Sequence, residues 1–153
     1  MRYAKESQDI KGVILQIDTP REEASLIEQI YLDVLQLRKR KPVVASIGAE
    51  GASGGYYIAV ASNFICAHPS SQIGSVGAWC SLPTPEELQE DIVPTGPFKS
   101  TGGSRRKAVA DLETVKEEFI SAVMTQRGDR LKLSPEELSR SEIYSGVESL
   151  KTV

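Results

Sequence analysis

The sequence predicts an α/β fold with a mostly parallel sheet flanked by helices. Two apolar runs rich in β-branched residues, at 10–18 and 42–48, have the composition of buried strands. Between them, residues 22–39 carry apolar side chains at helical spacing, with charged residues elsewhere on the helix. A strand, a helix and a strand within roughly 40 residues form a βαβ unit, and the strands of such a unit run parallel.

The other elements follow from local patterns. Thr19-Pro20 ends the first strand, and a short helix is expected after Ser53. Ser134 and Glu137 form a capping box that starts a late helix. The full set of further expectations is the end of a helix at 1–9, a strand at 64–68, a loop and strand at 69–78, a short helix at 83–90, a weak strand at 92–99, a polar loop at 100–107, an amphipathic helix at 112–126, and a turn followed by a helix at 144–153.

Composition narrows the function classes. The 153 residues are 40% hydrophobic and 25% charged, and the net charge of -3 gives no reason to expect nucleic acid as a partner. No stretch is long and apolar enough to span a membrane, so membrane association is expected only through segments outside this chain. Neither a metal cluster nor a nucleotide fingerprint is present, and no cofactor is expected. Cys66 lies in an apolar run and is expected to be a buried free thiol.

The stretch that carries chemistry is Gly-Ala-Ser-Gly-Gly-Tyr-Tyr at residues 51–57. It follows the second strand and precedes the short helix. A serine on a glycine-rich turn from strand to helix suits a nucleophile, because its small neighbours leave the hydroxyl open to a substrate. The start of the helix also directs free backbone N–H groups at any negative charge that develops there. The motif alone is weak, since most matches to it are tight turns.

Lys99 is the best available base for Ser53. Residues 51–85 contain no charged side chain, and no lysine or arginine occurs between Pro42 and Phe98. An apolar site favours the neutral amine of a lysine, which can then accept a proton, as a Ser–Lys dyad requires. The only histidine, His68, lies in a strand-like run, which disfavours a Ser-His-Asp triad. By chemistry alone Lys99 could equally be a surface lysine, and Ser75 could be a second hydroxyl that orients the amine or a plain turn residue.

At these positions the chain resembles the signal peptide peptidase A family of Ser–Lys peptidases, which has the ClpP/crotonase-like fold of repeated β-β-α units. The resemblance rests, in order, on residues 10–15, 41–46, 52–59, 74–77, 96–100 and 144–146. It implies a serine endopeptidase in which Ser53 attacks a peptide carbonyl, Lys99 is the general base and Ser75 holds the lysine. The backbone N–H of Gly54 would meet the oxyanion. Family substrates are remnant signal peptides and other membrane-associated or unfolded chains, and members form homo-oligomeric rings whose neighbouring subunits help complete the active site.

The chain departs from the family pattern at three places. Where the family has Pro-Gly-Gly, this chain has Pro20-Arg21-Glu22, so an oxyanion N–H would come from Arg21. The family's opening strands with its membrane anchor, and its extreme C-terminus, have no counterpart, so residues 1–153 are expected to form a single peptidase-like domain without them. The alternative function is therefore a catalytically impaired relative that acts as an oligomeric scaffold or peptide-binding module. A crotonase-like acyl-CoA enzyme would share the fold, but an exposed serine with a downstream lysine fits acyl transfer to serine better.

Overall fold

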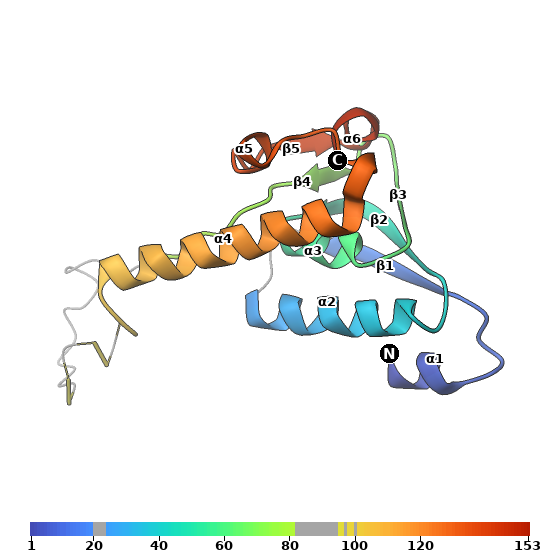
Figure 1. The fold of residues 1–153 in the computed structure, drawn as a ribbon, viewed down its shortest axis with the longest axis horizontal. Coiled ribbons are helices and arrows are strands. Elements are labelled where there is room, and N and C mark those ends of the chain that lie inside the picture. Colours follow the sequence, from blue (N-terminus) through green and yellow to red (C-terminus); the bar gives the residue numbers. More distant parts are fainter. Residues whose placement is uncertain (20–23, 82–94, 97, 100) are drawn as a thin grey trace.

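Over the described residues, the fold is a five-stranded sheet with helices packed on it (Figure 1). The computed structural model describes residues 1–19, 24–81, 95–96, 98–99 and 101–153. Its elements in chain order are α1 (Arg2–Glu6), β1 (Val13–Thr19), α2 (Ala24–Arg38), β2 (Val43–Ala52), α3 (Gly54–Val60), β3 (Phe64–Ala67), β4 (Gln72–Gly74), α4 (Arg105–Arg127), the 3₁₀ turn η1 (Gly128–Arg130), α5 (Pro135–Leu138), β5 (Ile143–Ser145) and α6 (Gly146–Thr152).

Strand β2 organises the sheet. It pairs in parallel with β1 along one edge, and along the other edge with β3 over its first half and with β4 over its last residues. Strand β5 pairs antiparallel with β4. The predicted fold class, an α/β fold with a mostly parallel sheet, is confirmed. Because β2 leads directly into α3, the residue between them stands at the carboxyl end of the central strand.

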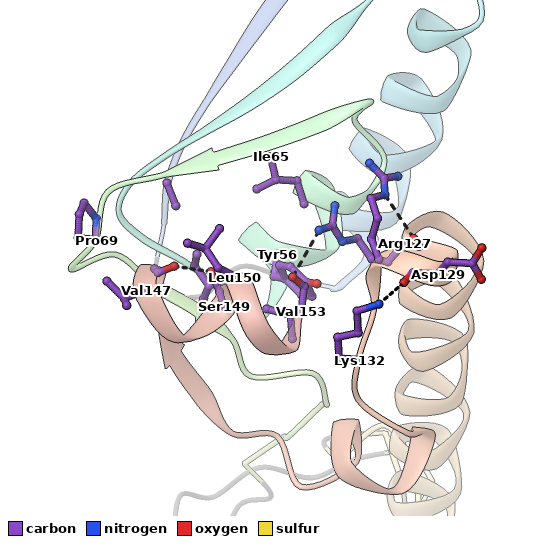
Figure 2. Close-up of a pocket in the computed structure, with 14 residues that line it drawn as sticks. Tyr56, Ile65, Pro69, Arg127, Asp129, Lys132, Val147, Ser149, Leu150 and Val153 are labelled. Atoms are coloured by element: carbon purple, nitrogen blue, oxygen red, sulfur yellow. Dashed lines mark hydrogen bonds between the residues drawn. The ribbon is translucent and has the colours of Figure 1, made fainter.

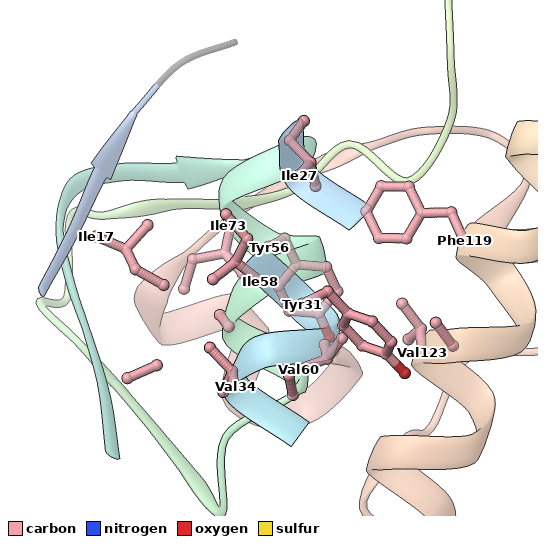
Figure 3. Close-up of a cluster of buried hydrophobic side chains, with 14 of the residues drawn as sticks. Ile17, Ile27, Tyr31, Val34, Tyr56, Ile58, Val60, Ile73, Phe119 and Val123 are labelled. Atoms are coloured by element: carbon pink, nitrogen blue, oxygen red, sulfur yellow. The ribbon is translucent and has the colours of Figure 1, made fainter. Parts of the chain in front are cut away.

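The core lies on one face of the sheet, against α2, α3 and the second half of α4 (Figure 3). From β2 it takes Val43, Ala45 and Ile47, which are almost fully buried. The rings of Tyr31 and Tyr57 stack at 4.6 Å between centroids, and Phe119 meets Tyr57 edge-on at 4.8 Å. Burial of each large apolar side chain stabilises the fold by about 1.5–3 kcal/mol, so this cluster fixes α3 and its preceding turn against β2.

The opposite face of the sheet is open, which corrects two predictions. Ile14 on β1 and Phe64 on β3 flank Val44 in register and are 76% and 64% exposed, so β1 is buried on one face only. Cys66, two residues beyond Phe64, points to the same face and is an exposed free thiol, not a buried one. The apolar run indicated a strand correctly, but it could not show which face would be covered.

The second half of the chain differs from the sequence expectations in three further places. Helix α4 starts at Arg105, because the Ser104 hydroxyl accepts a hydrogen bond from the Lys107 N–H at 3.2 Å, so residues 105–107 are helical and not loop. Thr95–Gly96 and Phe98–Lys99 are bends and turns, not strand. Residues 143–145 form β5. The helix expected at 83–90 lies outside the described residues, whereas the capping box of Ser134 and Glu137 is confirmed.

Candidate active site

Ser53 lies on the sharp turn from β2 to α3. Its backbone has φ 49° and ψ -120°, a combination that L-residues rarely adopt and that costs on the order of 1–3 kcal/mol. The turn is held from both sides: the Ser53 N–H donates to the Gly74 carbonyl at 2.8 Å, and the Ser53 carbonyl accepts from the Tyr57 N–H at 3.0 Å. The hydroxyl makes no capping hydrogen bond to α3, so it remains available to a substrate.

Helix α3 approaches the sheet closely because its first residues are small. A Cβ on Gly55 would lie 3.1 Å from Thr19 Cγ2 and 3.3 Å from Ile17 Cγ2, tighter than ordinary contact distances. The glycines therefore let the start of α3 sit against the end of β1. Gly54 is buried at the first position of α3, where backbone N–H groups have no intrahelical acceptor.

The segment after β4 borders the Ser53 turn. Gly74 and Ser75 both have positive φ, 103° and 54°, and the Ser75 N–H donates to the Glu142 carbonyl at 2.7 Å. A Cβ on Gly74 would lie 2.7 Å from that same carbonyl, which explains the glycine. Since the carbonyl of Gly74 also accepts the Ser53 N–H, the structure brings the Ser53 and Ser75 segments together.

Sequence reasoning missed the corner that holds this segment. Ser141 has φ 57°, and its hydroxyl donates to the Val76 carbonyl at 2.8 Å. This bond and the one from the Ser75 N–H to the Glu142 carbonyl hold the backbone on both sides of Ser75 against the residues that precede β5. No sequence signal points to this role, because Ser-Arg-Ser-Glu has the composition of an ordinary polar turn.

The structure does not bring Lys99 to Ser53 within one chain. Lys99 is exposed in a turn in which its N–H donates to the Gly96 carbonyl at 3.2 Å. The described residues of its segment, 95–96, 98–99 and 101, are yellow in Figure 1 and lie beyond the N-terminal end of α4, far from α3. Arg21 lies outside the described residues. His68 follows β3, where its N–H donates to the Ser71 hydroxyl at 3.0 Å and its carbonyl accepts the Ser71 N–H at 3.0 Å.

Metal clusters and membrane-spanning helices are both absent from the described part of the chain. No group of three or more His, Cys, Asp and Glu side chains there could hold a metal ion. Among the same residues, no helix has the length and apolar character needed to cross a membrane.

A strained serine on a strand-to-helix turn, on a mostly parallel α/β sheet, is typical of the class of serine-nucleophile hydrolases. Comparison with known proteins gives the family of the chain. Peptidase family S49 matches residues 35–149, well over half of the chain. The chain belongs to this family, which confirms the predicted relationship to signal peptide peptidase A and to serine-type endopeptidases.

Individual relatives agree with this assignment. The chain is 36% identical over 92 residues to the chloroplastic serine protease SPPA of Arabidopsis thaliana and 37% identical over 93 residues to Protease 4 of Haemophilus influenzae. Each match covers 60% of this chain but only 14% and 15% of the relative. A lysine-to-alanine mutant of the membrane-bound stomatin-specific protease 1510-N, solved with a substrate peptide, has the same fold, with a TM-score of 0.62 and 22% identity over 98% of this chain and 62% of that one.

Proposed function

We propose that this chain carries the nucleophile and the base of a Ser–Lys endopeptidase that cleaves remnant signal peptides or other membrane-associated or unfolded polypeptides. The observation that supports it most is the strained Ser53 turn, whose hydroxyl has no capping bond while its backbone is held by Gly74 and Tyr57. Strain of this kind persists only where the surrounding structure fixes it, and it gathers at functional sites.

The proposed reaction has two halves. The Ser53 hydroxyl attacks the peptide carbonyl while its proton passes to the neutral amine of Lys99, and the leaving amine then takes that proton as the peptide bond breaks. Water, deprotonated by the same amine, then attacks the ester carbonyl; the bond to Ser53 Oγ breaks, Oγ takes that proton back from the amine, and the carboxylic acid product leaves. Backbone N–H groups of Gly54 and Arg21 would hold the oxyanion, and one such donor lowers the barrier by about 3–4 kcal/mol.

Lys99 must reach Ser53 for this reaction. Because Lys99 is exposed and its segment lies away from α3 within one chain, the proposal requires that this segment fold over the site or that a neighbouring copy supply the lysine. In this proposal Ser75, which follows the Gly74 whose carbonyl fixes Ser53, accepts a hydrogen bond from the arriving amine. The homo-oligomeric ring and the single-domain organisation of residues 1–153 belong to the same proposal.

Labelling with a fluorophosphonate probe, read by intact mass, tests the proposal directly. Wild type should gain one adduct per chain, Ser53→Ala should gain none, and Lys99→Ala should react at least about 100-fold more slowly, because general-base catalysis contributes 10²–10⁴-fold. Equal labelling of Ser53→Ala would disprove the assigned nucleophile. If no form is labelled, the alternative of a catalytically impaired scaffold or peptide-binding module, motivated by Arg21 and Glu22 in the family's Gly-Gly positions, is favoured instead.

A further inference from the structure

A cavity lies apart from the Ser53 turn. It measures about 510 Å³ and is enclosed by β3, β4, the end of α4, η1 and α6 (Figure 2). Neither Ser53 nor Ser75 nor Lys99 is among the residues that line it. Its size falls in the range of small-molecule sites, which combine apolar walls with a few polar groups that fix orientation.

Two polar groups in this cavity are buried without hydrogen-bond partners. Tyr56 is 1% exposed, and its hydroxyl has no partner at acceptable geometry. The Nε of Arg127 is likewise buried and unpaired. Buried polar groups are almost always satisfied in folded proteins. The two groups lie close enough to shift each other's pKa, so one oxygen acceptor between them would satisfy both.

Three cationic residues, Arg127, Arg130 and Lys132, line the cavity with one carboxylate, that of Asp129, and this balance favours an anion. Burial and the neighbouring Arg130 lower the pKa of Arg127, and no carboxylate of the described residues forms an ion pair with it. The hydrogen bond that Arg127 Nη2 donates to the Val153 carbonyl is long, at 3.4 Å. Arg130 instead donates to the backbone carbonyls of Asn63 and Gln126, and Lys132 donates to the backbone carbonyl of Asp129.

Arg127 and the Tyr56 hydroxyl are therefore the available donors, and apolar side chains form another part of the wall. One guanidinium and one hydroxyl match the two oxygens of a single carboxylate, and a guanidinium binds carboxylates through paired N–H groups. The rim is formed by Ile65, Val147 and Leu150, with Leu150 86% exposed. An apolar chain attached to the carboxylate would cover these side chains and remove them from water.

We propose that this cavity binds the terminal carboxylate of an apolar chain, with Arg127 and the Tyr56 hydroxyl as its donors. A peptide with an apolar C-terminus and a fatty acid share this chemistry. The site is an equilibrium binding site, and it does not depend on Ser53 acting as a nucleophile.

Isothermal titration calorimetry on the full chain with Ser53→Ala, where no hydrolysis interferes, tests the site. The probes are acetyl-Ala-Val-Leu with a free carboxylate, the same peptide as its C-terminal amide, and octanoate. We expect the acid to bind at least about 10-fold more tightly than the amide, because a charge-assisted pair is lost in the amide. Binding of octanoate, of the peptide acid or of both identifies the source. Equal affinity for acid and amide, or no binding of either acid, overturns the proposal.

Variants locate the site. Arg127→Met keeps the aliphatic stem and should weaken the acid at least about 10-fold, and Tyr56→Phe should weaken it by about 5-fold. Arg130→Met is the matched control: it removes the same charge from the same cavity wall but should change affinity less than about 3-fold, since Arg130 is occupied by backbone carbonyls. Circular dichroism checks that both variants are folded. If Arg130→Met loses binding while the affinity of Arg127→Met is unchanged, the assignment is overturned.

Discussion

At the scale of the residue, Ser53 holds a conformation that glycine would adopt without strain. With φ 49° and ψ -120°, it occupies the mirror image of an extended conformation, which is open to glycine but costly for a residue with a Cβ. The serine is retained there although the backbone would be more stable without its Cβ. A nucleophile in that position explains the arrangement, since its function requires the side chain.

Two variants measure this strain. Ser53→Gly should have a free energy of unfolding about 1 kcal/mol higher than that of Ser53→Ala, because both lose the hydroxyl but only alanine keeps the strained Cβ. Urea denaturation followed by circular dichroism gives both values. An alanine variant as stable as the glycine variant, or more stable, would mean that the turn carries no strain.

Tyr56 gives the fold a dependence on high pH. Desolvation by burial raises the pKa of Tyr56 from 10.0 to about 12, although the nearby positive charge of Arg127 opposes the shift. Because the folded-state pKa lies above that of the unfolded chain, the neutral phenol favours folding below pH 10, and this contribution is lost as the pH rises from 10 to 12. The loss is about 2–3 kcal/mol in the free energy of unfolding.

Tyr56→Phe isolates that contribution. Its free energy of unfolding, measured by urea denaturation between pH 9 and pH 11.5, should fall less steeply with pH than that of wild type, while Tyr57 titrates in both proteins. Parallel curves for the two proteins would show that the Tyr56 phenol ionises as readily in the fold as in water.

At the scale of the element, the corner that enters β5 controls the geometry beside Ser53. The Ser141 hydroxyl donates to the Val76 carbonyl and the Glu142 carbonyl accepts the Ser75 N–H, so the backbone is held on both sides of Ser75. The adjacent Gly74 carbonyl accepts the Ser53 N–H. Ser141→Ala removes one hydrogen bond of about 1 kcal/mol, and the fluorophosphonate reaction of Ser53 should slow by about 3–10-fold as the segment loosens.

Ser139→Ala is the matched control for that experiment. Its hydroxyl also donates to a backbone carbonyl, that of Glu136 at 2.7 Å, but at an exposed position away from Ser75. It should label at the wild-type rate. If Ser141→Ala and Ser139→Ala label equally fast, the corner supports the fold without positioning the site.

The elements that sequence could predict are those with strong local signals. The β2–turn–α3 unit follows from an apolar run and a glycine-rich motif, and α5 follows from its capping box. Strand β5 is only three residues long, and its pairing with β4 is a tertiary contact that no local pattern encodes. The same holds for Ser141, whose role depends on Val76, which lies 65 residues earlier in the sequence. Exposure of Cys66 likewise depends on which face of the sheet is covered.

At the scale of the whole molecule, the separation of Lys99 from Ser53 within one chain raises the question of which copy supplies the base. Only the second half of α4 packs on the core, and its first half carries the preceding segment outward (Figure 1). The proposed ring offers one answer, in which Lys99 of one copy reaches Ser53 of another. In a ring built from head-to-tail contacts, each interface would then join the serine of one subunit to the lysine of the next.

Mixing two inactive variants distinguishes supply within a chain from supply between chains. Ser53→Ala and Lys99→Ala are co-expressed in equal amounts, and fluorophosphonate adducts are assigned by intact mass. Supply between chains predicts rapid labelling at about a quarter of all sites, since each site needs an intact serine beside an intact lysine and random assembly provides each of them with probability one half. The adducts should occur on the Lys99→Ala chain alone. Labelling no faster than that of Lys99→Ala by itself would mean that the lysine acts on the serine of its own chain, and that the segment of residues 95–101 must fold back over α3.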